Sequence, residues 1–370
     1  MQVDLVANVP LGSVSGIGRY LRELHAHLQD RIPVRVVTPI DPPLTRFLPS
    51  LHYFPLGLRG HQPGSIVHFT QIMGCSLMLW RPVRPAIATV HDLGVLVCPE
   101  DELLFNRLDR WLLDLQLAGL RRMDHYVVSS DYTRQGLQQL FGIPADRIHR
   151  VQLGVDMEHF RPIENAWERI SQRYGLTPVS GTVDLLYVGS ELPRKNLGRL
   201  LETVAILELE GYALRLIKVG GSGGARWRTQ FLADIQRLGL KDNVIVVDVV
   251  PEEDLPLFYN VCYLCVCPSL LEGGFSWPVM EAMACGAAAI ASTASHVPHH
   301  VQDAVLIVEP REVDSITEAV KKCLDDTGFR DALAEKGNNA IAAFTWEAGV
   351  EQMLNVYRTV WLESQDIDHV

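Results

Sequence analysis

The sequence from Cys267 to Ala288 reads CPSLLEGGFSWPVMEAMACGAA, and its residue types predict a strand, a glycine loop and a helix in succession. The apolar run Val261–Cys267 that leads into it suits a strand buried on both faces of a parallel sheet. Pro278 fits the first turn of a helix, where its missing N–H costs nothing, and the residues from Val279 favour a helix that Gly286 ends. The stretch therefore predicts a strand–loop–helix unit of an α/β domain.

The start of this helix is a predicted site for an anion. The N–H groups of a first helical turn have no partner within the helix, and here they point at the glycine loop. Glu272 and Glu281 flank that loop. Because a carboxylate repels phosphate, these two side chains are better suited to binding neutral hydroxyls. Amides for phosphate and carboxylates for sugar hydroxyls together predict a pocket for a nucleotide sugar.

The stretch Pro268–Gly286 is similar to the signature of the retaining glycosyltransferases of family four, which have the GT-B fold. The resemblance implies that Glu281 holds the donor's ribose and that four loop residues also bind the donor: Gly273, Gly274, Phe275 and Ser276. Eight residues separate Glu272 from Glu281, where the family has seven. Either the loop bulges by one residue and Glu272 still reaches the transferred sugar as a catalytic residue, or Glu272 is displaced.

A second loop supplies cations that a diphosphate requires. The predicted strand Val183–Val188 is followed by GSELPRKNL, in which Arg194 and Lys195 lie at a loop–helix junction. Cations there balance phosphate charge while amides orient the oxygens, although an exposed basic pair without a ligand is the alternative. In the resembled family this loop holds the donor diphosphate, and YVGSELPRKNL looks most like the O-antigen mannosyltransferase branch. Many members carry arginine directly after the glycine; this chain has Ser190, which leaves Arg194 and Lys195 as the ligands.

The first half of the chain has two candidate segments at the rim of its own predicted sheet. His91 directly follows the predicted strand Ala86–Val90, and TVHDL matches the family pattern in which this histidine contacts the transferred sugar. An imidazole suits that contact as a hydrogen-bond donor. A histidine after a strand is also commonly structural, so both interpretations remain open. Gly16 and Gly18, in SGIGRY, precede a helix and resemble the family's first loop, which faces the donor; they do not form a dinucleotide-binding motif.

Composition excludes several classes of protein. The net charge of −11 argues against nucleic-acid binding, and no apolar run approaches the ~18 residues of a membrane-spanning helix. Residues 1–162 carry 16 arginines and no lysine, which fits a phosphate-bearing acceptor, peripheral contact with a membrane, or a mere preference for arginine. Seven cysteines, mostly in apolar runs, predict reduced thiols and therefore a cytoplasmic location. Peripheral contact with the inner face of the membrane is compatible with that location.

Alternating strands and helices predict an α/β protein with two doubly wound parallel-sheet domains, which the resemblance implies face each other across a cleft. We place an N-terminal acceptor-binding domain at 1–162, a nucleotide-sugar-binding domain at 163–345, and a final helix that returns to the first domain at 346–370. The segment Leu103–Arg122 is expected to face the core rather than a membrane. The strands predicted for the first domain are Val3–Ala7, Val34–Thr38, His52–Pro55, Ile66–Thr70, Ala86–Val90, Tyr126–Ser129 and His149–Leu153.

The predicted reaction is retaining transfer of a hexose from a nucleotide sugar, GDP-mannose first and UDP-glucose second, to a saccharide or lipid-linked acceptor. Arg194, Lys195 and the loop amides would stabilise the leaving diphosphate, so no metal cofactor is expected. Two other classes remain open: a phosphorylase or epimerase of the same fold, and a nucleotide-sugar-binding subunit without turnover. Phosphorolysis with inorganic phosphate distinguishes the first, and donor binding without hydrolysis the second.

Overall fold

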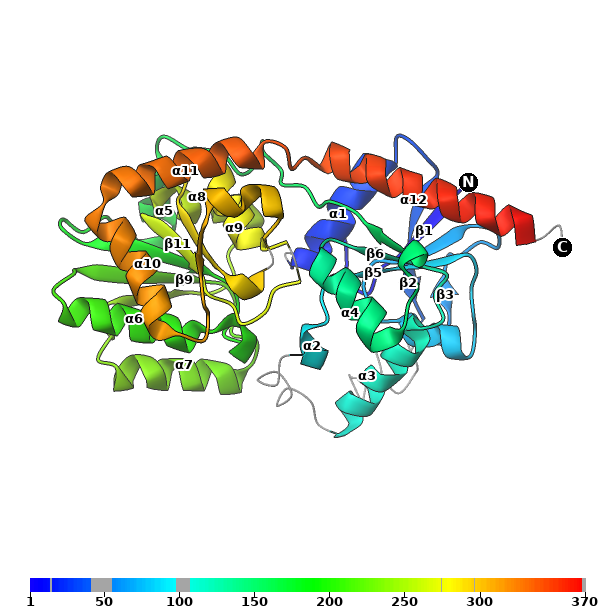
Figure 1. Ribbon diagram of the computed structural model, residues 1–370, viewed down its shortest axis with the longest axis horizontal. Coiled ribbons are helices and arrows are strands. Elements are labelled where there is room, and N and C mark those ends of the chain that lie inside the picture. Colours follow the sequence, from blue (N-terminus) through cyan, green and yellow to red (C-terminus); the bar gives the residue numbers. More distant parts are fainter. Residues whose placement is uncertain (14, 41–54, 98–106, 274, 296, 368–370) are drawn as a thin grey trace. The chain divides into compact units, whose positions relative to one another are not determined.

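The computed structural model describes residues 1–13, 15–40, 55–97, 107–273, 275–295 and 297–367, which form two compact units (Figure 1). The first unit comprises Met1–Leu93, Glu102–Gly154 and Trp346–Val370, and the second comprises Gly94–Asp101 and Val155–Thr345. Each unit is built around one largely parallel sheet with helices on its faces. The predicted α/β class is confirmed.

The first unit contains a seven-stranded sheet in the order β3-β2-β1-β4-β5-β6-β7, in which only the β2–β3 pair is antiparallel. The chain leaves β1 toward one edge and returns to β4 on its other side. In such open sheets ligands bind beyond the C-terminal ends of the strands at this reversal. The strands are β1 (Val3–Val6), β2 (Val34–Pro39), β3 (Leu58–Arg59), β4 (Ile66–Phe69), β5 (Ala86–Val90), β6 (His125–Val128) and β7 (Ile148–Arg150).

The helices of the first unit bury one apolar face each. α1 (Gly16–Leu28) packs against α12 (Trp346–Ile367), and α3 (Arg107–Leu120) packs against the 3-10 helix η3 (Cys75–Leu79). α3 buries Leu112, Leu113, Gln116, Leu117, Gly119 and Leu120, as expected for a core-facing helix. α4 (Asp131–Phe141) and η5 (Ala145–Arg147) complete the unit. Among the described helices of the chain, none is both long and apolar enough to cross a membrane.

The second unit contains a six-stranded, fully parallel sheet in the order β10-β9-β8-β11-β12-β13. Figure 1 shows α6 and α7 on one side of the strands and α5, α8 and α11 on the other. Its elements are α2 (Gly94–Val97), α5 (Ala166–Tyr174), β8 (Val183–Val188), η6 (Pro193–Lys195), α6 (Leu197–Leu209), β9 (Leu214–Val219), α7 (Ala225–Arg237), β10 (Val244–Val247), η7 (Glu252–Asp254), α8 (Leu255–Val261), β11 (Leu264–Cys267), α9 (Trp277–Ala284), β12 (Ala289–Ser292), η8 (Thr293–Ser295), η9 (His299–Ala304), β13 (Leu306–Val308), α10 (Val313–Asp325) and α11 (Thr327–Ile341).

Several predicted boundaries differ from the structure. The units change at Gly154–Val155 rather than after residue 162, because Val155 donates to the carbonyl of Phe344 and Phe160 packs on Tyr259. The strand predicted from Val261 begins at Leu264, since Val261 is the last residue of α8. Most of the predicted strand His52–Pro55 lies outside the described residues.

A buried polar chain joins α12 to the centre of the first sheet. His68 on β4 bonds the Tyr357 hydroxyl through Nδ1 and the Thr89 hydroxyl through Nε2, both at 2.7 Å. Thr89 in turn lies 2.9 Å from the hydroxyl of Tyr20 on α1. Burial, with a smaller contribution from nearby His91, lowers the pKa of His68 to about 3. His68 is therefore a neutral ring with both nitrogens satisfied.

Because His68 is buried in its neutral form, we expect the free energy of unfolding to decrease in acid. The unfolded chain takes up the His68 proton near pH 6.5, whereas the folded chain resists it down to about pH 3. Stability is therefore full well above pH 6.5 and falls on acidification, by roughly 2 kcal/mol between pH 6.5 and 5 and by about 4 kcal/mol down to pH 3. Urea unfolding at pH 7 and pH 5 measures the loss, which His68→Gln should reduce. The exposed His299 is the control, and an equal loss in His68→Gln and His299→Gln would contradict the assignment.

Candidate functional site

The loops that follow β8 and β11 are joined at the C-terminal edge of the second sheet. Asn196, a buried residue with φ of 61°, donates from Nδ2 to the carbonyls of Pro268 (2.8 Å) and Pro310 (2.6 Å). The Leu270 N–H donates to the Arg194 carbonyl at 2.7 Å. These bonds bring together the residues of the two loops that are predicted to bind the nucleotide-sugar donor.

Lys195 and Glu272 form an ion pair across these loops. Their side chains are only 18% and 14% exposed, and the Ser269 hydroxyl donates to the same Glu272 oxygen at 2.8 Å. Burial alone would raise the pKa of Glu272, but Lys195, Arg194 and Ser269 outweigh it, so the pKa lies below its usual range. Glu272 is therefore an ionised carboxylate beside the two cations that the sequence assigns to a diphosphate.

The start of α9 has the expected helix geometry. Trp277 and Pro278 form its first turn, Gly286 follows its end with φ of +78°, and Ser276 is its N-cap residue. The Ser276 side chain does not cap the helix, and its buried hydroxyl has no hydrogen-bond partner within the described part of the chain. Phe275 packs edge-on against Trp277 at 4.9 Å. Gly273 lies in this loop, and Gly274 lies outside the described residues.

Glu281 lies inside the second unit and is only 2% exposed. Its Oε2 accepts a hydrogen bond from the Tyr259 hydroxyl at 2.7 Å. Burial, reinforced by the carboxylate of Glu281, raises the pKa of Tyr259 well above its usual value, so the phenol remains a donor. The ribose-binding role expected for Glu281 stays a prediction.

His91 lies at the C-terminal end of β5 in the first unit. Its Nε2 is 2.9 Å from the Thr70 carbonyl, which can only accept, so Nε2 carries the proton. Burial lowers the pKa of His91 despite the opposing effects of Thr70 and Asp92, and the neutral ring presents Nδ1 as an acceptor. The Tyr20 ring packs edge-on against it at 4.8 Å. The sequence predicted a donor toward sugar, but the donor nitrogen is committed to Thr70.

Gly16 and Gly18 lie in the first turn of α1, whereas the sequence predicted them in the loop before the helix. Ser15 caps this helix, and its hydroxyl accepts from the Gly18 N–H at 3.1 Å. Gly18 is required because a Cβ there would collide with Ser13. The Gly18 amide is therefore engaged in the cap, and a ligand at this helix end would have to compete with Ser15.

Comparisons with known proteins agree with this arrangement. The model of glycosyl transferases group 1 matches residues 171–340, and that of glycosyltransferase family 4 matches residues 44–159. The O-antigen chain mannosyltransferase B of Escherichia coli is 29% identical over 288 residues, which cover 77% of this chain and 73% of that protein. The chain belongs to the family 4, group 1 glycosyltransferases. It is accordingly a hexosyltransferase.

Solved structures establish the GT-B fold for this glycosyltransferase. Sucrose-phosphate synthase from Thermosynechococcus elongatus has a TM-score of 0.78 at 22% identity, covering 98% of this chain and 100% of its own. Anabaena Alr3699/HepE, crystallised with UDP and glucose, has a TM-score of 0.73 at 16% identity, covering 97% of this chain and 100% of its own. At such identities the likeness concerns the fold alone.

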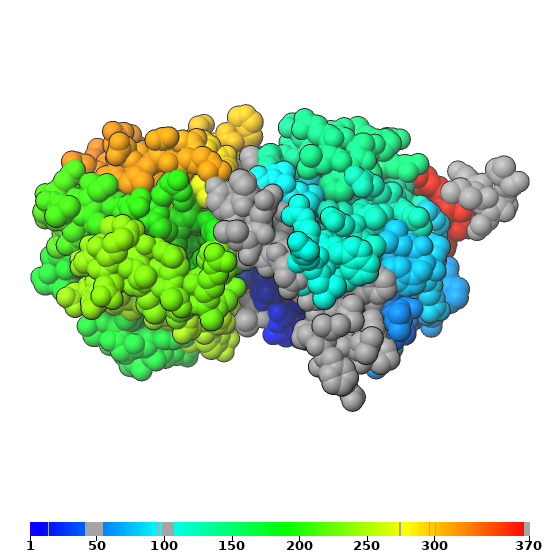
Figure 2. Space-filling view, turned by 90° about the horizontal axis from the view of Figure 1, so that it is seen from below, coloured from blue at the N-terminus to red at the C-terminus, as the bar shows by residue number. Residues whose placement is uncertain are grey.

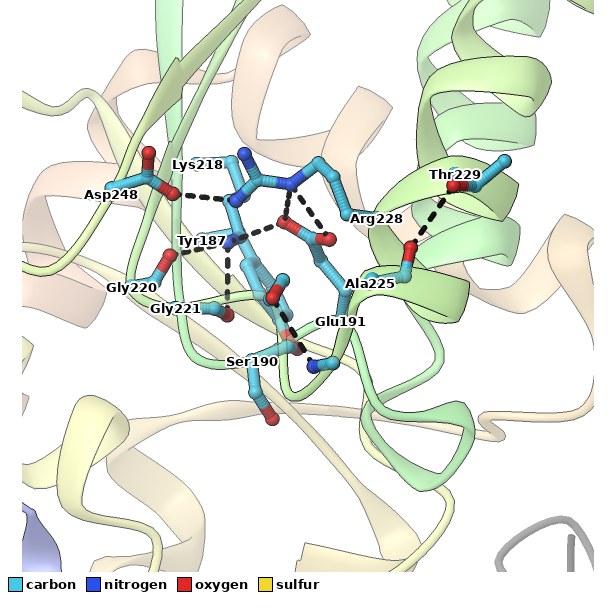
Figure 3. A network of polar contacts seen from close by, with 12 residues as sticks. Tyr187, Ser190, Glu191, Lys218, Gly220, Gly221, Ala225, Arg228, Thr229 and Asp248 are labelled. Carbon is cyan, nitrogen blue, oxygen red and sulfur yellow. Dashed lines mark hydrogen bonds and ion pairs between the residues drawn. The ribbon is translucent and has the colours of Figure 1, made fainter. Parts of the chain in front are cut away.

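The glycosyltransferase also has a charged cluster beside the donor loop that sequence reasoning missed. It consists of Glu191, Lys218, Arg228 and Asp248 (Figure 3). Lys218 lies in the apolar run LRLIKV of β9, and a lysine inside a buried strand was the signal that could have revealed it. Within the described residues, no group of three or more His, Cys, Asp or Glu side chains is arranged to hold a metal ion.

Proposed function

We propose that this hexosyltransferase moves mannose or glucose, with retention of configuration, from a nucleoside diphosphate sugar to a hydroxyl of a saccharide or lipid-linked acceptor. The observation that carries the proposal is the Lys195–Glu272 pair, shielded from solvent beside Arg194 and the first turn of α9. Cations and amides for a diphosphate, and a carboxylate for sugar hydroxyls, stand at one edge of one sheet. The mannosyltransferase relative supports the donor class.

In the proposed donor complex the diphosphate takes over Lys195 from Glu272. Phosphate oxygens form strong charge-assisted bonds with Lys195 and Arg194, while the uncapped first turn of α9 and the Ser276 hydroxyl supply further donors. Glu272, released from Lys195, then accepts from hydroxyls of the transferred sugar. Through this exchange Glu272 could still bind the transferred sugar, although one extra residue separates it from Glu281.

The proposed chemistry needs no protein nucleophile. The bond between the sugar's anomeric carbon and the diphosphate oxygen breaks, and the acceptor oxygen bonds to the same face of that carbon. The acceptor's proton passes to an oxygen of the leaving diphosphate. Lys195 and Arg194 stabilise the charge that develops on the diphosphate, and His91 Nδ1 accepts from a sugar hydroxyl. Because these cations supply the charge, we propose that the reaction is independent of metal.

A panel of nucleotide sugars tests the function directly. GDP-mannose or UDP-glucose is expected to raise the melting temperature, since a ligand of the native state stabilises it, and EDTA should leave transfer unchanged. Transfer is followed with radiolabelled donor and a mannose-containing oligosaccharide acceptor. Binding without donor hydrolysis or transfer would favour a binding subunit, and sugar phosphate formed from inorganic phosphate would favour a phosphorylase.

We propose that α3, which buries one side in the first unit, makes peripheral membrane contact through its exposed side, where a lipid-linked acceptor would be available. This helix lies at the surface of the first unit (Figure 2, cyan) and exposes Trp111 (53%) and Leu108 (36%) next to the exposed Arg107 and Arg110. Exposed aromatic and basic side chains favour anionic lipid surfaces. The free thiols described in the chain, such as Cys75, fit a location on the cytoplasmic, reducing side.

Vesicle sedimentation measures this contact. The protein is expected to sediment with vesicles containing 30% phosphatidylglycerol, and Trp111→Ser with Arg110→Gln should reduce the bound fraction several-fold. The exposed Leu232 on the second unit is the control, and Leu232→Ser should bind as the wild type does. Equal binding of all three proteins would contradict the role of α3.

A further inference from the structure

Lys218 is the centre of a buried network that the proposed chemistry does not use (Figure 3). Its Nζ donates to Glu191 Oε1 at 2.8 Å and to the carbonyls of Gly220 and Gly221 at 2.5 and 3.2 Å. Arg228 Nε donates to both Glu191 oxygens, at 2.8 and 2.9 Å, and its Nη2 donates to Asp248 at 2.6 Å. The three protons of Lys218 thus have three acceptors.

Burying these charges is costly. The side chains of Lys218 and Glu191 are 0% and 1% exposed, and ions removed from water are stable only when partners satisfy them. Burial lowers the pKa of Lys218, against the opposing effect of Glu191. An apolar pair of similar volume would often serve stability as well. Stability alone therefore does not account for the network, and charge-assisted bonds also fix the geometry of the groups that they join.

The network fixes two loops at the C-terminal edge of the sheet. Glu191 lies in the loop between β8 and η6, and Gly220 and Gly221 follow β9. The loops touch: Gly220 has φ of +123°, and a Cβ there would lie 2.7 Å from the Gly189 carbonyl oxygen. The Tyr187 hydroxyl holds the same loop through the Ser190 carbonyl at 2.8 Å. The first of these loops leads directly into Arg194 and Lys195.

Packing does not hold this loop on its outer side. A hollow of about 390 Å³ lies there, lined in part by Glu191, Leu192, Pro193 and Trp227. Side chains that face such a space have few apolar contacts to restrict them. On this side the loop is therefore held by the bonds that Glu191 makes toward the sheet, which act together with the Ser190 and Arg194 carbonyl bonds described above.

We propose that Glu191, Lys218 and Arg228 are positioning residues that hold the β8–η6 loop, and with it Arg194 and Lys195, in the conformation that receives the diphosphate of a nucleotide. The proposal rests on the proposed function of Arg194 and Lys195. It predicts an effect on the diphosphate part of the ligand and none on the nucleoside part.

Glu191→Gln and Arg228→Gln test the proposal, with Asp184→Asn as the matched control. Asp184 forms a buried pair with Arg215 near the N-terminal ends of β8 and β9, whereas the cluster lies at the C-terminal edge of the same sheet. Affinities for GDP, UDP and their nucleosides are measured by calorimetry or competition, and folding by melting temperature. Arg228 is 25% exposed, so its variant keeps the test available if Glu191→Gln fails to fold.

Both cluster variants are expected to weaken nucleoside diphosphate binding roughly ten- to a hundredfold, which is the loss typical of removing a residue that orients a binding group. Both should also raise the KM for the donor more than they lower kcat. Nucleoside affinity should not change, and Arg228→Lys should recover part of the loss. Asp184→Asn should lower the melting temperature and leave diphosphate affinity unchanged. Unchanged diphosphate affinity in both cluster variants, or equal weakening in the control, would overturn the proposal. A wild-type protein that binds no nucleoside diphosphate would instead refute the proposed function, and this inference with it.

Discussion

Lys195→Met is expected to lower kcat/KM for sugar transfer by roughly two to three orders of magnitude, the loss typical of removing a preorganised donor from a developing negative charge. Lys195 is held at the joined loops by Glu272 and is 18% exposed, so its ammonium is already placed before the donor arrives. The variant keeps an unbranched side chain of nearly the same length and removes the ammonium group, with its charge and its hydrogen-bond donors. Initial rates with the preferred donor, over a range of donor concentrations, measure the effect.

The control for this variant is Lys321→Met. Lys321 pairs with Glu210 on the surface of the same unit, where both side chains are about 40% exposed. An exposed pair contributes roughly 0–1 kcal/mol, so this change should alter neither rate nor melting temperature measurably. Equal activity of Lys195→Met and Lys321→Met would show that Lys195 does not bind the donor.

Glu272→Gln is expected to lower kcat by about a hundredfold, because an amide accepts a sugar hydroxyl more weakly than a carboxylate and no longer balances Lys195. The pKa of Glu272 lies below its usual range, so the wild-type carboxylate stays ionised at neutral pH. A mildly acidic buffer should therefore not lower the kcat of the wild-type protein as Glu272→Gln does. Protonation of Glu272 should lower kcat only when the pH falls through the lowered pKa of this carboxylate.

The double variant Lys195→Met with Glu272→Gln separates two roles of the carboxylate. If Glu272 only neutralises Lys195, its substitution should cost nothing once Lys195 is gone. If Glu272 grips the sugar, its loss should add to that of Lys195. We expect an additional loss. A double variant as active as Lys195→Met alone would show that the displaced glutamate does not reach the sugar.

The sequence predicted this site where neighbouring residues alone decide the structure. Pro278 and Gly286 mark the ends of α9 through local backbone preferences, and both were placed correctly. The pairing of Lys195 with Glu272 joins segments 77 positions apart, and no local pattern encodes it. The left-handed conformation of Asn196 also depends on the distant Pro268 and Pro310 carbonyls.

The domain boundary also depends on contacts between distant residues, which the local sequence does not encode. The sequence placed it near the turn at Pro162, where local signals are strongest. The structure puts Val155 in the second unit because of a bond to Phe344. The extra residue between Glu272 and Glu281 was visible in the sequence, but its effect on Glu272 depends on Lys195, which comes from another strand's loop.

The return of α12 to the first unit sets an order for biosynthesis. His68 meets its partner Tyr357 only 289 positions later, whereas the main segment of the second unit is complete at Thr345. The main segment of the second unit is thus synthesised before the first unit has the Tyr357 hydroxyl to which His68 Nδ1 bonds. The first unit, whose first segment is made first, therefore lacks α12 until after Thr345 has been synthesised.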